Sequence, residues 1–179
     1  MTFQEKYNKE VVPKLKEKFG YKNNFEIPRL QKAILNVGIG SSVRDASYLE
    51  LVEKTLKTIT GQKPVQNKAR KSIAGFKIRE GMVVGMSVTL RGKKMNDFVN
   101  KLINITLPRV RDFRGISLKS VDKNGNLNIG FKEYIVFPEI KIDDVERIHG
   151  LQAVIVTTAK TKEEGTELFK LLGVPFKKK

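Results

Sequence analysis

Two stretches of this chain alternate between apolar residues and small or polar residues, and this alternation restricts the fold more than any other feature. In residues 30–39 and again in residues 82–91, every other position is apolar. Because successive side chains of a β-strand point to opposite faces, each stretch predicts a strand with one buried and one open face. Such strands are typical of an antiparallel sheet that helices cover on one side. The predicted buried positions are Ala33, Leu35, Val37, Ile39, Val84, Met86, Val88 and Leu90.

The open faces of these two strands carry the first candidate site. Apart from Ile34 and Val83, their residues are small or polar: Lys32, Asn36, Gly38, Gly85, Ser87, Thr89 and Arg91. Short side chains let an RNA backbone come close, while amides, hydroxyls and cations bond to phosphates and 2′-hydroxyls. The alternative is that these residues simply face solvent. The open face of 82–91 has no aromatic residue on which a base can stack, so an RNA bound there is recognised through its folded backbone.

Apolar residues at helical spacing surround the strands. The first helical stretch has an apolar residue at every fourth position, and Pro13 inside it predicts a kink or a break. Thr2 and Glu5 form a capping box at its start. The apolar positions of this stretch are Phe3, Tyr7, Val11 and Leu15.

Three further helices have end signals in the sequence. One begins at Asp45 or Ser47 and ends at Gly61. Another contains residues 95–103 and is predicted to stop before Pro108. The last begins with a second capping box and ends before a glycine, and these residues are Thr161, Glu164 and Gly173.

The interleaved helices and strands predict an α+β fold. We expect a mostly antiparallel sheet with helices packed on one face and the other face exposed. An Asn-Gly turn at 124–125 predicts a hairpin. No long linker divides the chain, so we expect one domain, 1–179, with two long basic loops at about 68–81 and 107–120. The remaining predicted strands are 64–68, 127–131 and 151–158.

Charge narrows the choice of partner. Lys and Arg number 35 against 19 Asp and Glu, a net charge of +16, and the cations gather in the two loops while 133–167 is net acidic. Concentrated positive charge predicts contact with phosphates. The absence of cysteine excludes disulfides, Fe–S clusters and thiolate zinc sites. No apolar run approaches the ~20 residues that span a bilayer, and residues 1–10 lack an apolar signal region, so we expect a cytoplasmic protein without membrane contact.

Enzymatic alternatives rest on few residues. Asp143 and Asp144, with Glu139, offer a Mg²⁺ site for a nuclease, although adjacent carboxylates more often cap a helix. The single histidine, His149, has no nucleophile at a suggestive spacing and is interpreted as a structural or surface residue. A general module for single-stranded RNA is the other alternative, and it requires the stacking aromatics that the predicted sheet face lacks.

Five longer strings resemble one protein family. On these strings the chain resembles the family of the fifth ribosomal protein of the bacterial large subunit, which binds 5S rRNA, and the similarity extends from Lys6 to Gly173. The resemblance implies a five-stranded, RRM-like antiparallel sheet with helices on one side, and a structural role without enzymatic activity or a cofactor. The strings are Thr60–Pro64, Lys68–Gly81, Val88–Gly92, Leu107–Gly115 and Phe137–Ile140.

The resemblance also implies partners and contact residues. It implies that the protein helps attach 5S rRNA in the central protuberance, next to large-subunit rRNA and other 5S-binding ribosomal proteins. The residues implied for 5S rRNA are Lys32, Asn36, Gln62, Lys63, Lys68, Thr89 and Arg91. Those implied for the P-site tRNA are Arg70, Lys71, Ser72, Lys77 and Arg79. Those implied for an inter-subunit bridge to a protein of the small-subunit head are Arg109, Arg111, Asp112, Arg114, Asp143 and Asp144.

Overall fold

The protein is described by a computed structural model that covers residues 3–40, 45–141 and 147–177. The chain divides into two compact units, each assembled from separate stretches of sequence. The first unit consists of Met1–Ala33, Leu90–Ile129 and Val154–Lys179, and the second consists of Ile34–Thr89 and Gly130–Ala153. The expectation of one domain over 1–179 stays a prediction.

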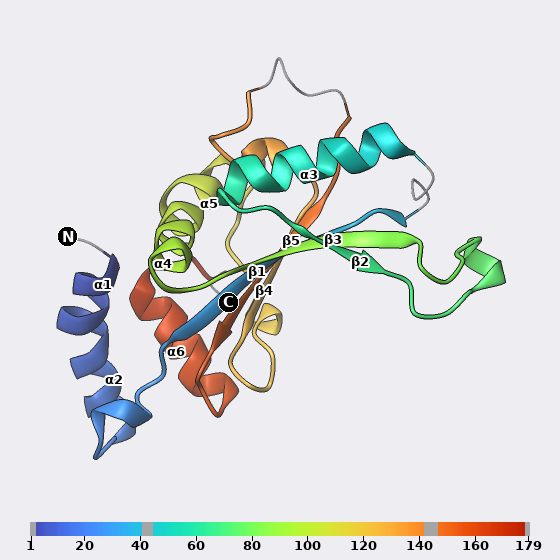
Figure 1. Ribbon diagram of the computed structural model, residues 1–179. Helices are drawn as coiled ribbons and strands as arrows, with labels where there is room; N and C mark the ends of the chain where they lie inside the picture. Colours follow the sequence, from blue (N-terminus) through green and yellow to red (C-terminus); the bar gives the residue numbers. More distant parts are fainter. Residues whose placement is uncertain (1–2, 41–44, 142–146, 178–179) are drawn as a thin grey trace. The chain divides into compact units, whose positions relative to one another are not determined.

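The predicted α+β fold with an antiparallel sheet is confirmed. Five strands pair in the order β2-β3-β1-β5-β4 (Figure 1). The edge pair β2 and β3 is antiparallel, with Val65 opposite Ser87. The strands are β1 (Leu30–Gly38), β2 (Val65–Lys68), β3 (Val83–Leu90), β4 (Leu127–Phe131) and β5 (Leu151–Thr157).

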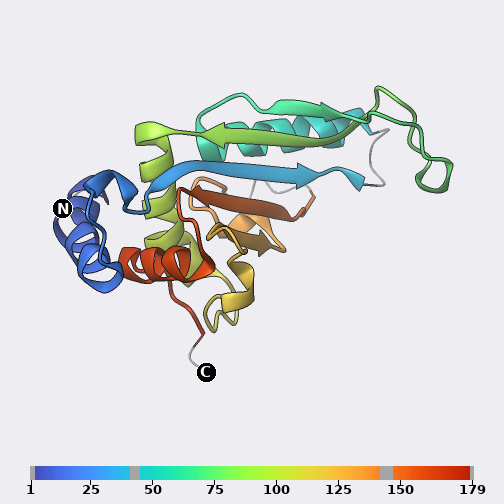
Figure 2. The same ribbon diagram turned by 90° about the horizontal axis from the view of Figure 1, so that it is seen from below.

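Burial along the strands follows the predicted alternation. In β1, Ala33, Leu35 and Val37 are fully buried, and the residues between them are half-exposed. In β3 the predicted apolar positions are buried except Val84, which is half-buried. Within the second unit, α3 (Ala46–Thr60) lies along β2 and β3 (Figures 1 and 2). In the described part of the chain, no helix has the length and apolar character needed to cross a bilayer.

Both ends of α3 follow their sequence signals. The Asp45 carboxylate accepts a hydrogen bond from the backbone N–H of Tyr48 at 3.2 Å, so Asp45 is the N-cap. Ser47 instead donates its hydroxyl to Asp45 at 2.6 Å. The helix ends at Gly61, whose φ of +63° is the left-handed conformation that favours glycine. The predicted capping box of α6 (Lys162–Leu172) is also confirmed.

Two prolines lie inside continuous helical segments. The helical segment that contains Pro13 continues through this residue without a break. The predicted stop before Pro108 is wrong, because the helical segment that contains Pro108 continues to Arg109. In each, a π-helical turn comes before the proline, and the residue before the proline donates to the carbonyl five residues earlier. This wider turn accommodates the ring, which clashes with the preceding turn of a regular α-helix. The segments are α1 (Phe3–Lys6), η1 (Tyr7–Val11) and α2 (Val12–Phe19), then α4 (Gly92–Lys101), η5 (Leu102–Thr106) and α5 (Leu107–Arg109). Thr2, the predicted cap, lies outside the described residues.

The predicted turn at 122–126 packs against α6 in the first unit. Asp122 Oδ1 accepts hydrogen bonds from the N–H groups of Asn124 at 2.9 Å and Asn126 at 2.8 Å. A Cβ on Gly165 of α6 would fall on the backbone of Gly125, so the two chain segments touch at a pair of glycines. In place of the predicted hairpin, a single antiparallel β-bridge joins Val121 to Leu127 beside this turn. The short 3₁₀ turns are η2 (Asn24–Glu26), η4 (Ala74–Phe76), η6 (Leu118–Ser120) and η7 (Tyr134–Val136).

Candidate nucleic-acid interface

Gly85 of β3 is buried, although the sequence predicted it on the open face of the sheet. A Cβ built on Gly85 would lie 3.1 Å from the carbonyl oxygen of Val37 and 4.0 Å from Oδ1 of Asn36. The Asn36 amide of β1 therefore lies beside Gly85 of β3. Even an alanine at position 85 would press on the neighbouring strand, so glycine allows β1 and β3 to pair closely here.

Two residues of the β2–β3 pair extend this polar surface. Asn67 lies opposite Gly85, and its Nδ2 donates to the Ser87 hydroxyl at 3.2 Å. Because directly opposed residues share a face of the sheet, Asn67 lies on the same face as Gly85 and Ser87. Asn67 is absent from the residues expected from the sequence, since its place depends on the pairing register.

A β-bulge interrupts the pairing next to Asn67. A regular register would pair Lys68 with Val84, but the shift between Asn67 and Lys68 pairs it with Val83 and leaves Val84 as the extra residue of β3. Lys68 directly follows Asn67 in β2, so the alternation of the strand places it on the other face of the sheet. Lys68 is exposed there.

Three uncharged side chains of this unit are available to a ligand. Among the described residues, the side chains of Asn36, Gln62 and Thr89 have no hydrogen-bond partner. Asn36 and Gln62 are nevertheless half-buried, where polar groups are usually paired. Continued by two residues, the β2–β3 register sets Lys63 opposite Thr89. The Lys63 ammonium is 80% exposed and 3.8 Å from Glu53, a pair too weak to hold it.

Two of the expected 5S-binding residues belong to the first unit. Lys32 is half-buried on β1, and Arg91 is exposed at the N-cap position of α4. The remaining five residues of that set all lie in the second unit.

The loop between β2 and β3 is built as an extension of the hairpin (Figure 1). Ile73 and Ile78 exchange two backbone hydrogen bonds, at 2.9 and 3.1 Å. The Ser72 hydroxyl accepts from the N–H of Glu80 at 2.9 Å, so Ser72 stabilises the loop itself. Phe76 at the tip is 76% exposed and was missed by the sequence analysis. The same loop carries four exposed cations without an ion pair to any described residue: Arg70, Lys71, Lys77 and Arg79.

The second basic loop begins later than predicted, at Val110, because residues 107–109 are helical. Ile116 donates its N–H to Pro175 at 2.8 Å, which ties the loop to the end of the described chain. The residues expected at a bridge are exposed here, and the closest contact between a cation and an acid among them is 4.0 Å. They are Arg109, Arg111, Asp112 and Arg114. Asp143 and Asp144 lie outside the described residues.

Of the two interpretations of His149, as a structural or as a surface residue, the structure supports the first. It is buried in the second unit, stacked on Tyr134 at a ring distance of 4.2 Å with the edge of Tyr48 6.2 Å away. Burial lowers the pKa of His149, and the Gly150 carbonyl only partly opposes this. Arg147 lies 4.7 Å over the Tyr48 ring and bonds to Asp45 at 3.3 Å.

Acid is therefore expected to destabilise the protein through His149. Because the folded state holds the lower pKa, the unfolded chain binds more protons below about pH 6.5, and stability falls as the pH drops below that value. Urea unfolding at pH 7.5 and pH 5 measures the effect. His149→Phe keeps a ring in the stack and should lose less stability between these pH values; an equal loss in both proteins contradicts the assignment.

The described ranges hold no cluster of three or more side chains suited to a metal. Glu139, the third member of the nuclease hypothesis, is half-buried. The acidic pair of that hypothesis is not described, so the geometry offers it no support.

Comparison with known proteins decides the family. The family model described as ribosomal protein L5 matches residues 23–79, and a second model, for the C-terminus of the same ribosomal family, matches residues 83–176. The chain belongs to the ribosomal protein L5 family. The large ribosomal subunit protein uL5 of Desulforapulum autotrophicum is 57% identical over 176 residues, 98% of each chain. The uL5 proteins of Halothermothrix orenii and Dictyoglomus turgidum are 54% and 53% identical, over 96% and 99% of each chain.

Membership in the L5 family confirms the resemblance on which the sequence analysis relied. It also separates the chain from the enzymatic alternatives, because this is a family of ribosomal proteins and not of enzymes.

Proposed function

We propose that this L5-family protein is part of the large ribosomal subunit in the cytoplasm and binds 5S rRNA there. The open sheet face of the second unit makes the contact. The observation that carries the proposal is the group of uncharged side chains in this unit that have no partners among the described residues, Asn36, Gln62 and Thr89. Such a surface recognises a folded RNA backbone, with Lys63 and Lys68 adding affinity through charge.

The other expected contacts complete the proposal. The basic hairpin loop reaches the P-site tRNA, and the loop that begins at Val110 forms an inter-subunit bridge with a protein of the small-subunit head. Lys32 and Arg91 of the first unit also contact 5S rRNA, and large-subunit rRNA and other 5S-binding ribosomal proteins lie next to the 5S rRNA in the central protuberance. What supports the tRNA contact is the exposure of four cations and of Phe76 in this loop.

The dissociation constants for 5S rRNA and for a control RNA of the size of a tRNA, each at two salt concentrations, test the proposal. Binding through shape and uncharged groups should favour 5S rRNA at both salt concentrations, whereas charge alone binds both RNAs and weakens steeply with salt. If both RNAs bind with equal affinity and both affinities fall equally with salt, the net charge of +16 alone explains the binding. The sheet face would then not be the binding site.

Thr89→Val is expected to weaken 5S rRNA binding by about 1–3 kcal/mol, the cost of leaving a polar partner unpaired. Valine has the shape of threonine but no hydroxyl, so a loss reports the hydrogen bond. Thr58→Val, at an exposed position of α3 in the same unit, is the matched control and should bind 5S rRNA as the wild type does. An unchanged affinity for Thr89→Val would exclude Thr89 from the interface.

A further inference from the structure

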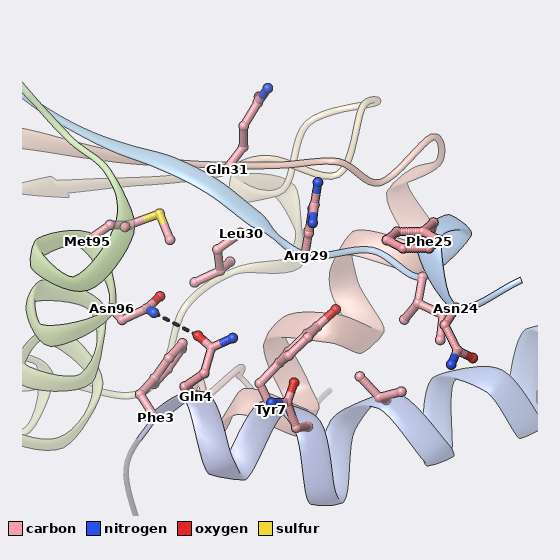
Figure 3. A pocket seen from close by; sticks show the side chains of 14 residues that line it. Phe3, Gln4, Tyr7, Asn24, Phe25, Arg29, Leu30, Gln31, Met95 and Asn96 are labelled. Atoms are coloured by element: carbon pink, nitrogen blue, oxygen red, sulfur yellow. Dashed lines mark hydrogen bonds between the residues drawn. The ribbon is translucent and has the colours of Figure 1, made fainter.

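A pocket of about 700 Å³ lies within the first unit. It is bounded by the first helical segment, by residues 24–31 and by the start of α4 (Figure 3). In the view of Figure 3, Met95 and Phe3 stand on one side of the pocket and Phe25 stands on the other. The lining is mixed, with apolar residues beside side-chain amides and one cation.

Phe25 is the most exposed large apolar side chain of the described chain, at 89%. Its backbone is fixed in the turn η2, where the Asn23 side chain accepts the N–H of Phe25 at 3.0 Å. The next turn residue is also held, because Lys16 donates to Asn24 at 3.2 Å. The fold therefore presents an aromatic ring to solvent from a well-anchored backbone, which is what a stacking contact requires.

The polar groups of the pocket indicate the chemistry of its ligand. Side-chain amides have both donors and acceptors, as the edges of nucleobases do. Arg29 is exposed, and among the described residues its guanidinium has no hydrogen bond or ion pair. The described residues that line the pocket include no carboxylate. The amide residues of the lining are Gln4, Asn8, Asn24, Gln31 and Asn96.

Arg29 is anchored through its backbone. Its N–H donates to the Thr158 hydroxyl at 3.0 Å, and its carbonyl accepts the N–H of Thr158 at 2.9 Å. Burial raises the pKa of Tyr7, and the positive charge of Arg29 lowers it in part. The Tyr7 hydroxyl donates to the Pro28 carbonyl at 2.9 Å and fixes the middle of the pocket.

We propose that this pocket binds one unstacked nucleobase of an RNA strand. Phe25 stacks on the base, the amides bond to its edge, and Arg29 binds the adjoining phosphate. Gln4 and Asn96 bond to each other at 2.9 Å, and Asn24 accepts from Lys16. An apolar side chain of a protein partner would leave Asn8, Gln31 and Arg29 without partners among the described residues. The pocket differs from the proposed 5S contact in what it binds, because it takes a flipped-out base, whereas the sheet face of the second unit binds folded backbone. None of the residues expected to bind 5S rRNA lines the pocket.

The sequence supplies a direct test, because the chain contains no tryptophan. Phe25→Trp places the only indole at the rim of the pocket, where a stacked base quenches its fluorescence. The probe is single-stranded penta-adenylate, and adenosine monophosphate is its comparison. Ile105→Trp is the matched control, since Ile105 is 45% exposed in the same unit and does not line the pocket.

We expect saturable quenching of Phe25→Trp by penta-adenylate, little quenching of Ile105→Trp, and about tenfold weaker binding when Arg29→Gln is added. Independently, Phe25→Ala should weaken the binding of dye-labelled penta-adenylate by about tenfold, a typical loss for a stacking aromatic. Equal quenching of both reporters, or none, overturns the proposal. So does equally tight binding of the mononucleotide, which would mark a site for free nucleotides, and so does full affinity in Phe25→Ala, which would leave the pocket to a protein partner.

Discussion

Gly165→Ala is expected to lower the free energy of unfolding by about 3 kcal/mol or more, the upper end of the cost of overpacking. The added Cβ falls on the backbone of Gly125, and that backbone is held in place. The Gly125 carbonyl accepts the Thr157 hydroxyl at 2.9 Å, and the Asn126 side chain accepts the N–H of Thr157 at 3.0 Å. Urea unfolding of the full chain measures the loss.

The matched control is Gly130→Ala. Gly130 is exposed in β4, and a Cβ built there meets no atom of the described residues within 4 Å. Its substitution should change the free energy of unfolding by less than about 0.5 kcal/mol, as most surface changes do. If the two variants have the same free energy of unfolding, the backbone of the turn at 122–126 moves at little cost, and the contact between Gly125 and Gly165 does not stabilise the fold.

Removing all three unpartnered groups of the sheet face should have the largest effect on RNA binding. The triple variant Asn36→Ala, Gln62→Ala and Thr89→Val is expected to lose at least about 100-fold in 5S rRNA affinity, since each lost polar contact costs about 1–3 kcal/mol. No charge is removed, so the slope of log affinity against log salt should stay as in the wild type. A changed slope with unchanged affinity would assign the contact to the cations instead.

The reciprocal variant carries Arg70→Ala, Lys71→Ala and Lys77→Ala in the hairpin loop. We expect normal 5S rRNA affinity, because these cations serve the tRNA contact in the proposal, and weaker P-site tRNA binding by ribosomes that contain the variant. Loss of 5S rRNA affinity would show that the surface has been divided wrongly between the two RNAs.

The sequence predicted those parts of the fold that local hydrogen bonding determines. The caps at Asp45 and Thr161 and the helix end at Gly61 depend on residues within one turn, and all three are confirmed. The alternation of β1 and β3 depends only on the two-residue period of a strand, and it is confirmed as well.

What the sequence did not predict depends on pairing between distant segments. The bulge at Val84, next to the pair of Asn67 and Gly85, exists only where β3 pairs with β2, and no local signal marks it. The position of Asn67 beside Ser87 depends on the same pairing. The contact roles of the loops came from the family resemblance, and the structure shows only that their cations are exposed.

The π-helical turns explain a periodicity that a regular helix cannot maintain. An α-helix advances about 100° per residue, so a repeat of four residues drifts by about 40° at each step and winds the apolar stripe around the helix. A wider turn underwinds the helix and straightens the stripe. Both segments that contain a π-helical turn have this repeat, in Phe3, Tyr7, Val11 and Leu15 and again in Met95, Val99, Ile103 and Leu107. An unbroken apolar repeat of four residues next to a proline thus indicates an underwound helix. In this chain it predicts that the helices continue through Pro13 and Pro108.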